Sequence, residues 1–185
     1  MTLVSLKVKR RTSTSFSMGK YTVTSNIRLH QSNVLDGEIN KVFTGKINVS
    51  GKEQSKFVLS TIQSSKFIRI FVKLKNDSDP SLEDVVHNTS VRFLEIPVSN
   101  ERSRRSNKND FNSNVLQIDQ FHVLNKFQRQ GCGSKVMGII FLWIKAYYPM
   151  IKKCFVVSPS LIGIPFYLKL GASRQRCSRN LEFQL

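Results

Sequence analysis

The segment Phe127-Gln128-Arg129-Gln130-Gly131-Cys132-Gly133-Ser134 is a Gln/Arg-rich turn that closes on a Gly-X-Gly pair. A strand is predicted before it, over Val115 to Leu124, and a strongly apolar helix after it, over Gly133 to Tyr148. A glycine turn at a helix N-terminus presents free backbone N–H groups and the positive end of the helix dipole, so it suits the phosphates of a nucleotide-like ligand. Gly-X-Gly alone is a weak signal, because most such pairs only allow a tight turn.

A second segment, Phe166-Tyr167-Leu168-Lys169-Leu170-Gly171-Ala172, strengthens the interpretation of the turn. It follows a predicted apolar strand, Lys153 to Val157, and belongs to a predicted helix, Leu161 to Leu170, that Gly171 would end. With strand, turn, helix, strand and helix in this order, the two strands are expected to be parallel, and the ligand is expected at one edge of the sheet that they form. The turn is neither a Rossmann fingerprint nor a Walker loop, because the further residues of those motifs are missing.

On these two segments the chain resembles the GNAT superfamily of N-acetyltransferases. Gln128-X-X-Gly131-X-Gly133 is similar to the acetyl-CoA turn of that family, and Phe166-Tyr167-X-Lys169-X-Gly171 to its second signature. The resemblance covers residues 113–173, the expected acetyl-CoA-binding core. It implies an α/β (α+β) fold over residues 1–185, a single domain whose mixed, mostly antiparallel central sheet is flanked by helices.

The resemblance also implies acetyl-CoA as the acetyl donor, without a metal. Backbone N–H groups of residues 129–134 would hold the pyrophosphate, Arg129 would add charge, and the strand edge at 121–123 would pair with the pantetheine arm. Ser160 would hydrogen-bond the ligand, although capping of the following helix explains it equally well. The residues expected to contact acetyl-CoA are Phe121, His122, Val123, Gln128, Arg129, Gln130, Gly131, Cys132, Gly133, Ser134 and Ser160.

Three groups are candidates for the chemistry. By the resemblance, Tyr167 donates a proton to the departing CoA sulfur, and the backbone N–H of Val123 faces the thioester oxygen. Asp119 is the best candidate for the general base, because it is the one acid on the strand before the turn; an ordinary polar strand residue is the other interpretation. His122 is the second candidate, Glu95 in the N-terminal half is a third, and an acceptor that arrives neutral would need no base.

The charge of the chain favours an anionic ligand or partner. Its 185 residues carry a formal net charge of +17, and no Asp or Glu occurs between Asp119 and Glu182, where ten Lys and Arg residues lie. This suits the phosphates of CoA, and equally a nucleic-acid backbone or an anionic acceptor. Three scattered cysteines predict no disulfide framework or zinc site and favour a reducing, cytoplasmic location, with organelle import left open. No apolar run is long enough for a membrane span.

The first hundred residues are rich in Val, Ile, Thr and Phe, which predicts strands; the helices usual in the family cannot be placed there. The expected strands are Thr2 to Lys9, Lys20 to Leu29, Val42 to Val49, Phe57 to Ile62, Phe67 to Leu74 and Val91 to Val98. Residues 99–114 are almost free of apolar side chains and predict a flexible loop or insertion. A last strand is predicted over Arg176 to Leu185.

Two functions follow as hypotheses. The first is an acetyl-CoA-dependent N-acetyltransferase that acts on a primary amine of a protein, an RNA-linked or a small-molecule acceptor. The second is a non-catalytic module that binds CoA or nucleic acid, which the uncertain base and the unusual N-terminal half favour.

Overall fold

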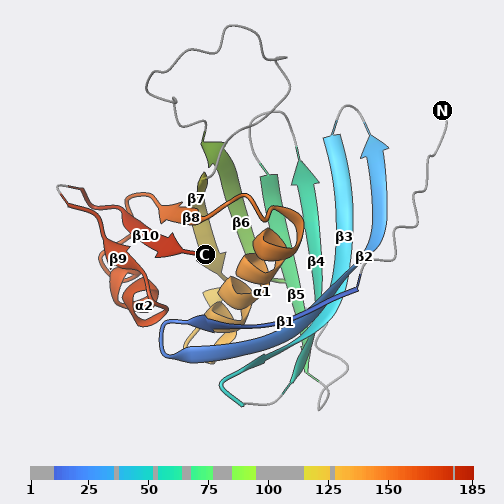
Figure 1. The fold of residues 1–185 in the computed structure, drawn as a ribbon, viewed down its shortest axis with the longest axis horizontal. Helices are drawn as coiled ribbons and strands as arrows, with labels where there is room; N and C mark the ends of the chain where they lie inside the picture. The colour runs from blue at the N-terminus through green and yellow to red at the C-terminus, as the bar shows by residue number, and fades with distance from the viewer. Residues whose placement is uncertain are drawn as a thin grey trace, which may run out of the picture.

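The computed structural model describes residues 11–35, 38–51, 54–63, 68–76, 85–94, 115–125, 128–176 and 178–185. The described strands form one sheet in the order β1-β2-β3-β4-β5-β6-β7-β8-β10-β9 (Figure 1). Neighbouring strands are antiparallel except β7 and β8, which are parallel. The strands are β1 (Arg11–Met18), β2 (Tyr21–Leu35), β3 (Glu38–Val49), β4 (Ser55–Gln63), β5 (Ile68–Asn76), β6 (Val85–Leu94), β7 (Val115–Val123), β8 (Lys153–Val156), β9 (Ser173–Arg174) and β10 (Leu181–Gln184).

Alternation of apolar and polar residues explains the N-terminal strands. In β5, Ile68, Ile70 and Val72 are buried, whereas Arg69 and Lys73 between and after them are exposed. Such a period of two is what a sheet with one covered face requires. The strands β1 to β6 follow one another as antiparallel neighbours, so this half of the chain is a β-meander.

The covered face of the sheet packs on helix α1 (Cys132–Tyr147). Every residue from Val136 to Ile144 is buried, because the sheet curves around the helix (Figure 1). Gly138 allows the closest approach: a Cβ atom there would lie 3.0 Å from Cδ1 of Ile47 and 3.4 Å from Cγ1 of Val23. The core therefore lies between α1 and the long antiparallel strands.

The predicted fold class is wrong. A mixed sheet flanked by helices was expected, but the described part of the chain is mostly antiparallel strand with two helices, α1 and the short α2 (Ile164–Lys169). The described segments up to residue 94 form strands and turns, and the burial of β4 and of residues 68–74 alternates every two residues rather than every three to four. The helix-flanked architecture that the resemblance implied is thereby excluded.

The expected strands that fall in the described residues are all present, with shifted bounds. The strand predicted at Val91 to Val98 begins earlier, at Val85, and the helix predicted at Leu161 to Leu170 begins at Ile164. Strands β1 and β9 were not predicted. The strand expected at 2–9 and the loop expected at 99–114 lie outside the described residues, and within those residues no helix is long and apolar enough to cross a bilayer.

Candidate functional site

Strands β7 and β8 separate after four paired residues. They are in parallel register from Val115 opposite Lys153 to Ile118 opposite Val156, where β8 ends. The last hydrogen bond between the two segments is donated by the Val157 N–H to the Ile118 carbonyl, at 3.4 Å. Strand β7 continues, and its pairing with β6 shifts by one residue at Asp119, a β-bulge that redirects the strand. The edge of β7 beyond Ile118 thus faces an opening instead of a neighbouring strand.

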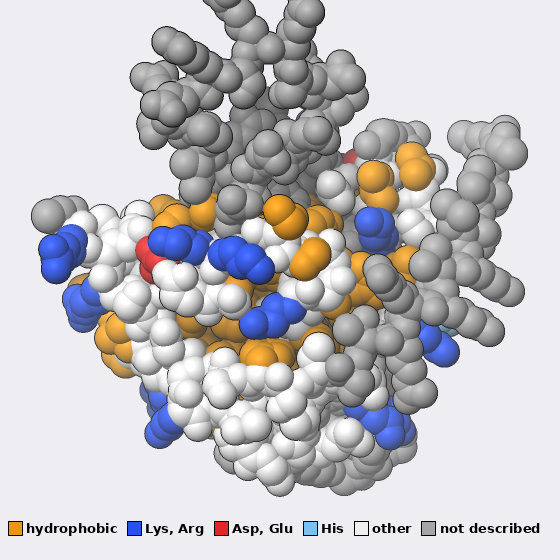
Figure 2. Space-filling model, in the orientation of Figure 1, with side chains coloured by type: hydrophobic (Ala, Val, Ile, Leu, Met, Phe, Trp, Pro, Cys, Tyr) orange, Lys and Arg blue, Asp and Glu red, His pale blue; other side chains and the backbone are white. Residues whose placement is uncertain are grey.

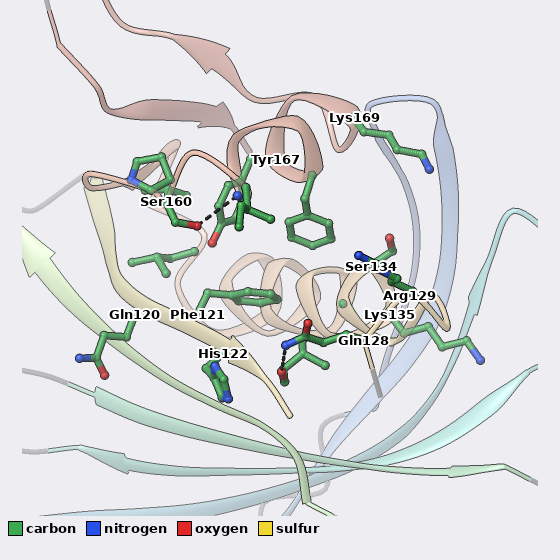
Figure 3. Close-up of a pocket in the computed structure, with 18 of the residues that line it drawn as sticks. Gln120, Phe121, His122, Gln128, Arg129, Ser134, Lys135, Ser160, Tyr167 and Lys169 are labelled. Carbon is green, nitrogen blue, oxygen red and sulfur yellow. Dashed lines mark hydrogen bonds between the residues drawn. The ribbon is translucent and has the colours of Figure 1, made fainter. Parts of the chain in front are cut away.

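A cavity of about 1390 Å³ fills this opening. Its walls are the edge of β7, the turn at 128–135, the loop at 157–163, helix α2, and Tyr21 and Val49 from the N-terminal strands (Figure 3). Of the predicted site residues, the cavity is lined by Asp119, Phe121, His122, Val123, Gln128, Arg129, Gln130, Gly131, Gly133, Ser134, Ser160 and Tyr167. Cys132 does not line it; its half-buried side chain packs against the core, and burial raises the pKa of its thiol.

The turn is held in shape by its backbone and by Gln128. Gly131 has φ 81° and caps α1, and Arg129 also has a positive φ of 62°, which is uncommon outside glycine. The Gln128 amide donates from Nε2 to the Val123 carbonyl and to Oδ1 of Asn125, each at 2.9 Å. The Gln128 amide thus ties the turn to the end of β7, and the predicted contact of Gln128 with the ligand stays a prediction.

The first turn of α1 is arranged for an anion. The N–H groups of Cys132, Gly133 and Ser134 precede the first intrahelical bond, from Lys135 to the Gly131 carbonyl, and the helix has no side-chain cap. It has no acidic residue in this turn, to which Lys135 belongs and which Arg129 precedes by three residues. Cations at a helix N-terminus oppose the dipole, so a bound anion would stabilise this arrangement.

The two glycines of the turn serve different purposes. A Cβ atom at Gly131 would meet nothing within 4 Å, so a side chain there would project into open space at the cavity wall. A Cβ atom at Gly133 would lie 3.1 Å from Cε2 and 3.2 Å from Cζ of Phe166. Gly133 therefore allows α1 and α2 to pack closely.

Tyr167 projects from α2 into an aromatic cluster. Its ring centroid lies 5.1 Å from that of Phe166, 6.1 Å from Phe121 and 6.4 Å from Phe183. The residue is 6% exposed, and its hydroxyl has no hydrogen-bond partner among the described residues. Figure 3 shows the hydroxyl directed into the cavity on the side of Ser160. Burial, with a smaller contribution from the neighbouring Cys154 thiol, raises the pKa of Tyr167 to about 12, so it is protonated at neutral pH.

Asp119 and His122 differ in orientation. Asp119 is partly buried in the cavity wall, and its carboxylate accepts a short hydrogen bond from Nε2 of Gln117, which confirms that the two share a strand face. Among the described residues that line the cavity, Asp119 is the one carboxylate. His122 is exposed, and Figure 3 shows its side chain on the other side of β7 from the Phe121 ring. Glu95 lies outside the described residues.

Ser160 caps the turn before α2. Its Oγ accepts a hydrogen bond from the Gly163 N–H at 3.1 Å, and its carbonyl accepts from the same group at 2.8 Å. The N-cap of α2 is Gly163 and the helix has no side-chain cap, so Ser160 closes the preceding turn and the expected capping of the helix by its side chain is wrong. Its place in the cavity wall leaves ligand contact as a prediction.

Sequence reasoning missed cavity residues that come from distant segments. Tyr21 opens β2, and Lys169 ends α2; the ammonium of Lys169 lies 5.9 Å from the centroid of the Tyr21 ring. Lys135 donates from Nζ to Oγ of Ser55 at 2.6 Å, which joins α1 to the start of β4. Lys169 was visible in the second motif, but nothing in the local sequence around Tyr21 indicates its position.

Comparison with known proteins adds no assignment: no protein-family model matches this chain, and no curated protein matches it.

Proposed function

We propose that this chain binds acetyl-CoA in the cavity between β7 and β8 and transfers the acetyl group to a primary amine. The observation that carries the proposal is the meeting of three features on one cavity. These are the open edge of β7, the cation-flanked first turn of α1, and the Tyr167 hydroxyl that has no partner among the described residues.

The order of these features along the cavity fits a long ligand with phosphates at one end. The turn joins the end of β7 at Val123, through the Gln128 amide, and would hold the pyrophosphate. Tyr167 packs near Phe121, two residues further back on the strand, so the thioester would lie there. Extended pantetheine would run along the strand edge between these points. Val123 is then nearer to the phosphates than to the thioester, and its predicted role as oxyanion donor stays a prediction.

The chemistry assigns one proton transfer to each of two side chains. A neutral amine attacks the thioester carbonyl, and the carbon–sulfur bond breaks as the tetrahedral intermediate collapses. Tyr167 gives its proton to the departing thiolate, and Asp119 takes a proton from the amine through water. Since a phenol with a raised pKa is protonated until a thiolate forms beside it, Tyr167 suits the acid role.

Thiol release tests the proposal. The protein is incubated with acetyl-CoA and a panel of primary amines that includes lysine peptides, peptide N-termini, polyamines and aminoacyl-tRNA. We expect CoA release that depends on one acceptor class and is competitively inhibited by desulfo-CoA. Saturable binding of acetyl-CoA without release across the panel would contradict the transferase and favour the binding module.

A binding module for a polyanion is the second candidate, and the outer face of the sheet favours it. Lys46 on β3 lies directly opposite Lys56 on β4, and both are exposed, as are Arg69 and Lys73 on β5. Four exposed basic side chains on three adjacent strands give this face a positive charge, which a polyanion would complement. Figure 2 shows Lys and Arg side chains spread over another face of the molecule, with few acidic ones among them.

RNA binding tests this second candidate. If the outer face binds a phosphate backbone, the affinity for single-stranded RNA falls steeply with salt, and Lys46→Glu weakens it. An interaction that does not respond to salt contradicts the module.

We also propose a reducing, cytoplasmic location for the protein. Cys132 and Cys154 are both free thiols, which agrees with such a compartment.

A further inference from the structure

The turn between β1 and β2 lies against the end of helix α2, at one end of the cavity. A Cβ atom at Gly171 would lie 2.7 Å from the Gly19 nitrogen, and one at Gly19 would lie 2.6 Å from the Lys169 carbonyl oxygen. Both glycines have positive φ, 57° at Gly19 and 94° at Gly171. The two backbones are therefore in direct contact, which fixes the hairpin beside α2 (Figure 1).

This contact assembles two lysines around one aromatic ring. The ammonium of Lys20 lies 6.0 Å from the centroid of the Tyr21 ring, and that of Lys169 lies 5.9 Å from it. Tyr21 and Lys169 both line the cavity, and Figure 3 shows Lys169 on the same side as Arg129 and Ser134. The cluster is thus continuous with the turn that begins α1.

The charges in this cluster are not balanced by the protein. Among the residues that the structure describes, neither Lys20, Lys169 nor Arg129 forms an ion pair or a side-chain hydrogen bond. Two ammonium groups near one ring repel each other, and a cation–π contact offsets only part of that cost. A phosphate bound beside the ring would supply the negative charge that these ammonium groups lack.

We infer that Tyr21, Lys20 and Lys169 form a second phosphate subsite, which binds the 3′-phosphate of the adenosine end of CoA. The inference rests on the proposed function, because it assumes that the pyrophosphate occupies the adjacent turn. CoA is a ligand with this chemistry: a ribose 3′-phosphate and an adenine lie just beyond its pyrophosphate. The N-terminal strands would then contribute directly to recognition of the donor.

Titration calorimetry with acetyl-CoA and acetyl-3′-dephospho-CoA tests the subsite. Wild-type protein is expected to bind acetyl-CoA about tenfold more tightly than the dephospho form, the value of one charge-assisted contact. Lys20→Met and Lys169→Met should each reduce that ratio, and the double variant should bring it to about one, with binding of the dephospho form unchanged. Lys169→Arg should restore the preference, because it keeps the charge.

Lys145→Met is the matched control. Lys145 also lies over an aromatic ring, 5.4 Å from the centroid of Phe16, but it does not line the cavity, so the ratio should stay at the wild-type value. Equal wild-type affinity for the two ligands overturns the subsite and leaves the proposed function intact. An equal loss of affinity for both ligands in the lysine variants also overturns it. Failure of the wild type to bind either ligand overturns both proposals.

Discussion

Replacing Tyr167 with phenylalanine separates catalysis from stability. The substitution keeps the ring contacts with Phe121, Phe166 and Phe183 and removes a hydroxyl that has no hydrogen-bond partner among the described residues. A typical hydrogen bond contributes about 1 kcal/mol, and none is lost here, so the free energy of unfolding should change by less than about 0.5 kcal/mol.

The expected effect on turnover is much larger. Loss of a positioned general acid typically costs about 10²-fold to 10⁴-fold, and a factor of 10² corresponds to about 2.7 kcal/mol of transition-state stabilisation. The affinity for acetyl-CoA should remain within about twofold of wild type, because the proposed phosphate site lies at the other end of the cavity. Thiol release under saturating acetyl-CoA measures turnover, and urea unfolding measures stability.

Tyr148→Phe provides the matched control for this experiment. Tyr148 packs at 5.0 Å from the centroid of Trp143, and burial raises its pKa to about 12 as well, but it does not line the cavity. Its replacement should leave turnover unchanged. Turnover of Tyr167→Phe within twofold of wild type would refute the acid role. A loss of more than about 2 kcal/mol of stability would show that the hydroxyl has a structural partner.

Three further results are expected. Gly133→Ala should destabilise the fold by about 1 kcal/mol in urea unfolding, because the new Cβ lies 3.1 Å from the Phe166 ring; an unchanged midpoint would contradict the close packing. Asp119→Asn should lower turnover by about 10²-fold at neutral pH and less at high pH, where the amine is neutral; a pH-independent loss would argue against a base. Folded Tyr148 and Tyr167 hold their protons to about pH 12 and unfolded tyrosine to about pH 10, so each should contribute stability below pH 10. That contribution should fall by about 1.4 kcal/mol per pH unit between these values, and a flat stability profile there would count against the burial of both phenols.

The C-terminal elements could be predicted because their signals are local. The apolar helix after the turn, the short apolar strand β8 and the glycine stop at Gly171 each follow from neighbouring residues, and the parallel pairing of β7 and β8 follows from their connection through α1. The helix-flanked class was wrong because it extended a resemblance over residues 113–173 to a half of the chain whose residues alternate as strands. In that half of the chain, the pattern of the residues predicted the strands better than the family resemblance did.

The composition of the site was predictable only in part. The motif predicted a turn that the structure places in the cavity wall, but not that the Gln128 amide would fix the turn or that Gly133 would pack against Phe166. Tyr21 enters the cavity through the backbone contact of Gly19 with Gly171, residues far apart in the sequence. Contacts of this kind depend on the curvature of the whole sheet, and the local sequence pattern does not predict that curvature.

Binding of acetyl-CoA, measured by titration calorimetry, tests the central claim most directly. Wild-type protein is expected to bind one acetyl-CoA per chain, and Gly131→Glu to abolish binding, because its side chain would bring negative charge to the proposed phosphate turn. Gly131→Ala carries the same backbone strain at φ 81° without the charge, so it should retain most of the affinity. No wild-type binding at millimolar ligand, or full affinity in Gly131→Glu, would contradict the assignment of this cavity to acetyl-CoA.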